Sequence, residues 1–151
     1  MGHITVGIDL DARPDEVWRV VERIERHVEW MADAVAIRFE TEQTRGAGTR
    51  FVCDTRVGPL RLSDRMIVTE WTPGVAMGVD HTGLVTGSGR FTLAALPAGR
   101  TRFTWEEELR FPWWLGGPVG AFAGGLLMRA IWRRNLRRLA ALVARERDQA
   151  A

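Results

Sequence analysis

Hydrophobic and polar residues alternate along several short runs of the chain, which is the pattern of strands with one buried face. The clearest run is residues 101–111, in which Phe103, Trp105 and Leu109 share one face and charged or hydroxyl side chains share the other. Glu107 falls on the apolar face. A carboxylate there is costly unless it is paired, hydrated or protonated, so Glu107 is the most informative residue in the sequence.

Six further segments show the same alternation and are separated by turns that contain Gly or Pro. We expect these strands at residues 4–10, 34–40, 48–57, 60–71, 75–81 and 89–95. Short turns between consecutive strands predict an antiparallel meander. Val35, Ile37 and Phe39 share the face of strand 34–40 that we expect to be buried. Asp64 and His81 also fall on inward faces, which adds two polar side chains to Glu107.

A helical period appears in two regions. Pro14, followed by two acidic residues, suits a first helical turn, and apolar residues continue at helical spacing, with a kink, to Met31. A long helix over about residues 119–147 carries an apolar stripe that includes Trp132 and needs a concave sheet to lie against. Asn135 lies within this stripe, where its amide must bond either a pocket ligand or nearby backbone.

A corner rich in Pro and Gly, residues 112–118, joins the last strand to this helix and contains Trp113 and Trp114. Our first expectation is that both indoles pack under the helix, and the alternative is that they gate a pocket or touch a membrane surface. Residues 111–128 carry no charge, but two prolines and five glycines favour a loop and the start of a helix over a membrane span. Peripheral membrane contact remains an open possibility.

The amino-acid composition excludes several kinds of catalytic and binding chemistry. All 21 basic residues among the 151 are arginine, so lysine Schiff bases and a phosphate-binding lysine are excluded. The chain has no tyrosine, and its single cysteine, Cys53, is expected to be a small buried apolar group. The formal charge of +2 and the lack of interleaved aromatic residues on the arginine-rich face of the helix predict no nucleic-acid partner. One domain over residues 1–151 is the expected organisation.

Other kinds of site find no support in the residues. His3, His27 and His81 are dispersed and lack metal-ligand spacing, and Ser63 and Ser88 lie outside any nucleophile-elbow motif. We therefore expect no metal and no cofactor. The chain opens without a signal-peptide pattern, from which we expect a cytoplasmic protein.

The order of these elements resembles the START/Bet v 1-like (SRPBCC) superfamily, in its polyketide cyclase/dehydrase and lipid-transport-like branch. The segment ARPDEVW at residues 12–18 resembles the joint between its opening strand and helix, and TRFTW at residues 101–105 resembles its closing strand. The resemblance implies an α+β helix-grip fold. In that fold a curved antiparallel sheet of about seven strands, two short helices and a long C-terminal helix enclose an apolar cavity.

The resemblance also implies that the inward side chains line this cavity. The apolar walls would be Phe51, Met66, Phe91, Phe103, Trp105 and Trp132, and the polar groups would be Glu107, Asp64, His81 and Asn135. The first hypothesis is a carrier or sensor that binds a hydrophobic or aromatic small molecule or a lipid. The second is a polyketide cyclase/aromatase-like enzyme in which Glu107 and His81 handle protons, although the absence of tyrosine departs from that chemistry. The third is a protein-interaction domain that uses the basic helix.

Overall fold

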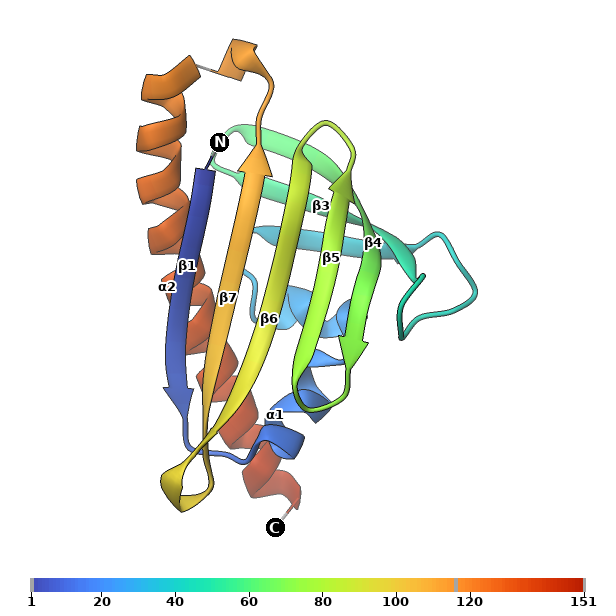
Figure 1. Ribbon diagram of the computed structural model, residues 1–151, viewed down its shortest axis with the longest axis vertical. Coiled ribbons are helices and arrows are strands. Elements are labelled where there is room, and N and C mark those ends of the chain that lie inside the picture. The colour runs from blue at the N-terminus through green and yellow to red at the C-terminus, as the bar shows by residue number, and fades with distance from the viewer. Residues whose placement is uncertain (1, 116, 151) are drawn as a thin grey trace.

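The computed structural model describes residues 2–115 and 117–150 and forms one antiparallel sheet in the order β1-β7-β6-β5-β4-β3-β2 (Figure 1). The strands are β1 Gly2–Leu10, β2 Ala34–Phe39, β3 Arg50–Val57, β4 Leu60–Thr72, β5 Ala76–Thr82, β6 Thr86–Leu96 and β7 Arg100–Arg110. The helices are α1 Pro14–Val21, η1 Ile24–Glu29, η2 Pro97–Gly99, η3 Trp113–Leu115 and α2 Gly117–Ala150. The predicted helix-grip architecture is confirmed.

The first and last strands are neighbours, because β7 pairs with β1 on one side and with β6 on the other. The sheet is strongly bent, so that β2, β3 and the start of β4 cross behind the other strands (Figure 1). Helix α2 runs alongside β1, and α1 and η1 lie on the same concave side. The space between this bent sheet and α2 therefore contains the buried side chains.

The sequence misplaced one inward residue of β2. We predicted that Val35 is buried with Ile37 and Phe39, but Val35 is exposed and Ala34 is buried instead. The pairing of β2 with β3 shifts register between Ala34 and Ala36. Such a bulge moves one residue out of the two-residue alternation, so the simple period fails at this point.

The first helical region is two short helices, α1 and η1, as the resemblance implied. The Arg13 amide donates to Glu16 at the start of α1 (2.8 Å), which satisfies one of the free amides at the helix N-terminus. At the other end the buried ring of His27 donates from Nε2 to the Val21 carbonyl oxygen (2.7 Å). This bond satisfies a carbonyl that a helix end leaves without a partner, and it fixes η1 against α1.

The tryptophan corner lies outside the core. Trp113 is 85% exposed and Trp114 is 57% exposed, so our expectation that both pack under α2 is wrong. A Cβ built at Gly124 or Gly125 would meet no atom within 4 Å, which shows that this part of α2 makes no close contact at those positions. Within residues 2–115 and 117–150, none of the helices combines the length and the hydrophobicity that a bilayer span requires.

The space between sheet and helix has two different ends. Near the C-terminal half of α2 it is packed with buried side chains, and we call this set the filled end: Leu10, Val21, Trp30, Phe103, Leu136 and Leu139. Toward the N-terminal half of α2 the same space contains a cavity, and we call this part the hollow end.

Candidate functional site

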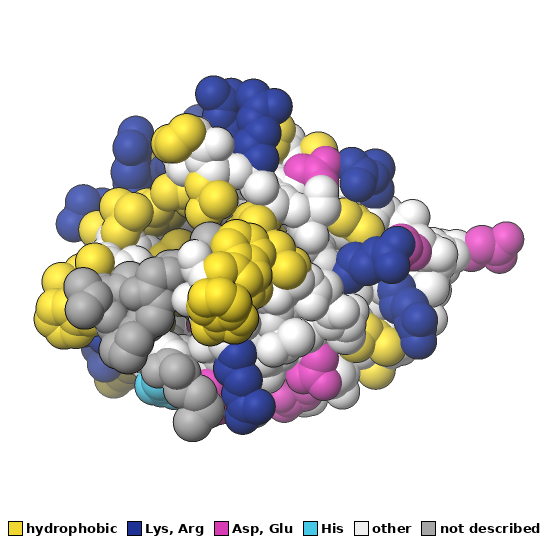
Figure 2. Space-filling view, turned by 90° about the horizontal axis from the view of Figure 1, so that it is seen from above, with side chains coloured by type: hydrophobic (Ala, Val, Ile, Leu, Met, Phe, Trp, Pro, Cys, Tyr) yellow, Lys and Arg dark blue, Asp and Glu magenta, His cyan; other side chains and the backbone are white. Residues whose placement is uncertain are grey.

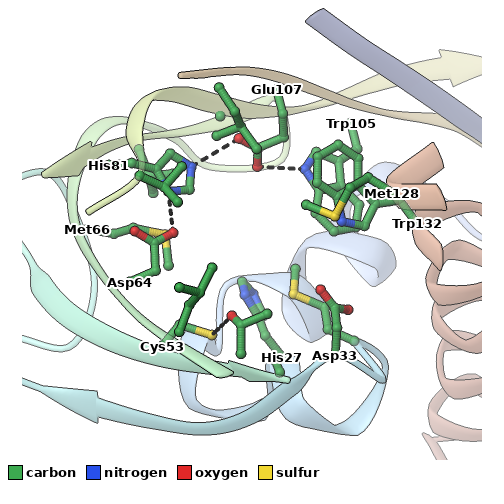
Figure 3. Close-up of a pocket in the computed structure, with 18 of the residues that line it drawn as sticks. His27, Asp33, Cys53, Asp64, Met66, His81, Trp105, Glu107, Met128 and Trp132 are labelled. Carbon is green, nitrogen blue, oxygen red and sulfur yellow. Dashed lines mark hydrogen bonds and ion pairs between the residues drawn. The ribbon is translucent and has the colours of Figure 1, made fainter. Parts of the chain in front are cut away.

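The cavity of the hollow end has a volume of about 140 Å³ and a mostly apolar lining (Figure 3). Its walls come from β2 to β7, η1 and α2, so the bend of the sheet creates it. Eight of the ten predicted site residues line it: Phe51, Met66, Phe91, Trp105, Trp132, Glu107, Asp64 and His81. The inward faces that the sequence predicted therefore point most of the predicted site residues into this space.

Three of these residues form a hydrogen-bonded group that we call the acid–histidine cluster: Asp64, His81 and Glu107. The imidazole of His81 lies between the two carboxylates, with Nδ1 2.5 Å from Asp64 Oδ2 and Nε2 3.0 Å from Glu107 Oε2 (Figure 3). Their side chains are largely buried. The residues come from β4, β5 and β7, so only the folded sheet brings them together.

Glu107 is held in place on two sides. Its Oε1 accepts a hydrogen bond from the Trp105 indole Nε1–H (2.9 Å), two residues earlier on the same face of β7. The Trp105 ring stacks on Trp132 of α2, with centroids 4.7 Å apart and an interplanar angle of 21°. This chain of contacts connects the carboxylate to the long helix through two aromatic rings.

Gly89 makes room for the Glu107 carboxylate. It lies opposite Glu107 in the β6–β7 register, and a Cβ at Gly89 would come within 2.5 Å of Glu107 Oε1. Real Cβ atoms do not approach that closely, so a side chain at this position would force the carboxylate or the strand to move. The glycine is therefore part of the site although it has no functional group.

The cluster keeps a proton on His81. Burial alone would lower the pKa of His81, but the hydrogen bonds to Asp64 and Glu107 outweigh it and raise the pKa to about 10. The ring is then a cation at neutral pH, and both of its N–H groups donate to carboxylates. A histidine in this state is a fixed positive charge between two negative charges.

A second histidine, His27, lines the opposite part of the cavity and has the reverse character. Burial lowers the pKa of His27 to about 4, so its ring is neutral at pH 7. Since Nε2–H donates to the Val21 carbonyl, Nδ1 carries the lone pair. Sequence reasoning placed His27 in a helix but gave it no role, and its position between Ile24 and Trp30 was the only sign that it is buried.

Cys53 and Asp33 also line the cavity, although we did not predict either as a site residue. Cys53 lies opposite Asp64 in the β3–β4 register, and burial raises the pKa of its thiol to about 11. The thiol is therefore protonated at neutral pH, which suits the small apolar role that the sequence suggested.

Two predicted residues do not line the cavity. Asn135 is fully buried beside the turn after η1, where its Oδ1 accepts from the Ala32 amide (3.0 Å) and its Nδ2 donates to Asp33 (2.7 Å). Phe103 belongs to the filled end and packs against Phe91 and Trp30. Both side chains face inward as expected, but each lies behind a residue of the lining, Asn135 behind Asp33 and Phe103 behind Phe91.

No metal site accompanies the cluster. In the part of the chain that the structure describes, no group of three or more His, Cys, Asp or Glu side chains is arranged to hold a metal ion.

Comparison with solved structures shows the same fold in proteins of low sequence identity. A Thermus thermophilus protein is 17% identical, with a TM-score of 0.77, over 95% of this chain and 98% of that chain. A START superfamily protein from Mycobacterium smegmatis is 14% identical, with a TM-score of 0.71, over 96% and 99% of the two chains. An aromatase/cyclase from Streptomyces is 17% identical, with a TM-score of 0.69, over 97% and 93%.

Comparison with protein families is more specific. A search among curated proteins finds no match. The family model described as polyketide cyclase / dehydrase and lipid transport matches residues 1–144, which is nearly the whole chain. The resemblance to the START/Bet v 1-like superfamily that the sequence pattern suggested is thereby confirmed, and the chain belongs to the polyketide cyclase / dehydrase and lipid transport family.

Proposed function

We propose that this protein binds a hydrophobic or aromatic small molecule in the cavity of its hollow end, as a carrier or sensor. The observation that carries the proposal is an apolar cavity with one group of buried polar side chains on its wall, which is the usual composition of a small-molecule site. A cavity of about 150 Å³ lined by apolar side chains binds benzene in another protein. The present volume of about 140 Å³ therefore suits one or two rings, or the end of a longer chain.

The cavity also has a way out for a longer ligand. Phe111 lines it and is 41% exposed, so the lining reaches the surface beyond the end of β7. A ligand larger than the enclosed space can extend past Phe111 toward the start of α2, where Met128 lines the same space.

An enzyme of the cyclase/aromatase type is the second candidate, and the acid–histidine cluster is the observation that favours it. A general acid or base works best when its pKa lies near the working pH. The pKa of His81 is raised to about 10, so the imidazolium holds its proton rather than exchanging it near neutrality. This property favours a binding and orienting role over proton transfer, and binding is our first proposal.

Native mass spectrometry of the purified protein tests the binding proposal directly. We expect an additional discrete mass that denaturation releases, and extraction then identifies its chemical class. The variant Val79→Phe fills the cavity and should abolish this mass, whereas Val75→Phe, at an exposed position before β5, should retain it. Retention of the same bound mass by folded Val79→Phe would contradict binding in this cavity.

We also propose that the protein contacts a membrane surface peripherally and that the ligand enters the cavity from that membrane. The support is a cluster of exposed hydrophobic side chains, which we call the apolar end: Phe111, Trp113, Trp114, Phe122, Leu126 and Leu127. Figure 2 looks onto this end of the molecule and shows hydrophobic side chains gathered there, with arginines around them. Exposed indole and phenyl rings next to arginines suit the interface of an anionic bilayer. Phe111 belongs to both the apolar end and the cavity lining, so the membrane and the ligand site would be continuous.

A further inference from the structure

We infer that the ligand presents a hydrogen-bond donor, such as an alcohol, a phenol or a protonated amine, to the acid–histidine cluster, and that a carboxylate or phosphate end is rejected. This inference rests on the proposed binding function and specifies the class of molecule that the cavity accepts. It follows from which hydrogen-bonding groups of the lining are already used and which remain free.

The N–H donors of His81, Trp105 and His27 in the lining are already occupied. Both N–H groups of His81 donate to carboxylates, to Asp64 on one side and to Glu107 on the other. The indole N–H of Trp105 donates to Glu107, and the ring N–H of His27 donates to the Val21 carbonyl. None of these donors can serve a carbonyl or carboxylate of a ligand without breaking a bond that is already made.

Acceptors, by contrast, remain available. A carboxylate offers about four acceptor sites on its two oxygens. Each Glu107 oxygen accepts one hydrogen bond from a side chain, and Asp64 Oδ1 is buried without any hydrogen-bond partner. His27 Nδ1 carries a lone pair because Nε2 holds the proton. A ligand hydroxyl or ammonium can therefore bond to the cluster through Glu107, and Asp64 Oδ1, which is buried, could take part only after the Asp64 side chain rotates.

The charges of the lining also favour a ligand that donates hydrogen bonds over an anionic one. Asp33, Asp64 and Glu107 are acidic, and the His81 imidazolium is paired with the last two of them. Arg90 also contributes to the lining, but its guanidinium bonds Glu70 (Nε to Oε2, 2.7 Å), and the side chain is 47% exposed. The remaining donors among the described lining side chains are all neutral: the Trp132 indole N–H, the Thr55 hydroxyl and the Cys53 thiol. An anionic ligand would thus be desolvated beside carboxylates without a free cation to pair with.

Four probes that differ only in one substituent test this inference: naphthalene, 2-naphthol, 2-naphthylmethylammonium and 2-naphthoate. Isothermal titration calorimetry at pH 7 would measure their dissociation constants for the full chain. We expect 2-naphthol and the ammonium probe to bind about tenfold more tightly than naphthalene, since one hydrogen bond contributes on that scale. We expect 2-naphthoate to bind more weakly than naphthalene.

The outcomes separate this inference from the proposed function. If 2-naphthoate binds as tightly as 2-naphthol, or if all four probes bind alike, the cavity binds apolar molecules but our donor inference is wrong. If none of the four binds, both the proposed function and the inference fail. The ordered series that we expect supports both.

Two variants tie the preference to the cluster. Glu107→Gln replaces one acceptor oxygen with an amide donor, so the ratio of affinities for 2-naphthol and 2-naphthoate should fall several-fold. Asp64→Asn gives a second test at the other end of the cluster if the first variant folds poorly. Glu108→Gln makes the same change on the exposed face of β7 and should keep the ratio of the unmodified protein. An unchanged ratio in both folded cluster variants would overturn the inference.

Discussion

The two ends of the space between sheet and helix are built from the same elements but treat buried polar groups differently. At the filled end both halves of the buried Asn135 amide bond the turn at Ala32 and Asp33, although the buried Trp30 indole N–H has no hydrogen-bond partner. At the hollow end Asp64, His81 and Glu107 bond one another on the wall of a cavity, and Asp64 Oδ1 is left without a partner.

Under the binding function that we propose, this difference would let one architecture serve stability and binding at once. A fully satisfied amide beside close-packed side chains fixes where α2 sits against the sheet. A cluster with unused acceptors beside empty volume costs stability, unless a ligand fills the volume and uses those acceptors. The filled end can therefore supply the rigidity that the hollow end lacks, and substitutions at the two ends should have different consequences.

The largest expected effect is Phe103→Ala, which removes a fully buried ring from the filled end. Truncation of a packed phenylalanine costs about 3–5 kcal/mol in the free energy of unfolding, through lost burial and the void that it leaves. Phe51→Ala at the cavity wall should cost clearly less, because one side of that ring already faces empty space. Equilibrium urea denaturation measures both, and equal losses would contradict the division into two ends.

Gly89→Ala should lower the free energy of unfolding by a smaller amount, because the new methyl group collides with the Glu107 carboxylate. Overpacking of this kind costs about 1–3 kcal/mol. In a Glu107→Ala background the same substitution should cost much less, since the colliding atoms are gone. A double-mutant cycle of unfolding free energies measures the coupling, and additive losses would show that Gly89 does not accommodate the carboxylate.

The two cavity histidines predict opposite slopes of stability with pH. The pKa of His81 is raised from 6.5 to about 10, so its contribution is complete below pH 6.5 and is lost as the pH rises through 10. The pKa of His27 is lowered from 6.5 to about 4, so the unfolded chain gains protons first and stability falls as the pH drops from 6.5 to 4.

Urea midpoints measured from pH 4 to pH 10 should therefore be highest near pH 6.5. His81→Gln should remove the decline between pH 6.5 and 9 and leave the decline on the acidic side; above pH 9 the raised pKa of the Cys53 thiol also lowers stability. His27→Gln should remove the decline on the acidic side and leave the alkaline one. If the decline between pH 6.5 and 9 persists in folded His81→Gln, the cluster does not hold the proton that we assign to it.

The sequence predicted well which way side chains point, but it did not predict which of them contact one another. A period of two placed Glu107, Asp64 and His81 inward on three separate strands, because each lies among alternating apolar residues. Their contact depends on the register in which β4 to β7 pair. The turns and the strand pairing set that register, and the residue pattern of a single strand does not predict it. Gly89 was placed on an inward face, but its closeness to Glu107 required the same register.

Other differences have local causes. A bulge reversed the direction of Val35, and inward residues of the filled end could not be told from those of the hollow end by periodicity. Asn135 shows this limit, because its amide was expected to need partners and found them in a turn 103 residues earlier in the chain. The residue pattern of one helix cannot predict a contact with a segment so far away in the chain.

The smallest effect on stability is expected at the apolar end. Replacing both Trp113 and Trp114 with alanine removes little buried area, so the free energy of unfolding should change by less than about 1 kcal/mol. The same double variant should bind sedimented vesicles of phosphatidylcholine and phosphatidylserine several-fold more weakly than the unmodified protein, because interfacial indoles contribute most of the apolar contact.

A matched control for this loss is Val35→Ala with Val75→Ala, which truncates two exposed hydrophobic side chains away from the apolar end. That variant should sediment with the vesicles like the unmodified protein. Vesicles of phosphatidylcholine alone should retain less of each protein, since the arginines near the apolar end then lack anionic headgroups. If the tryptophan variant sediments fully, the apolar end does not contact membranes. The exposed hydrophobic side chains of the apolar end would then contribute neither to stability nor to lipid binding. The contrast between the filled end and the hollow end would then concern the interior alone.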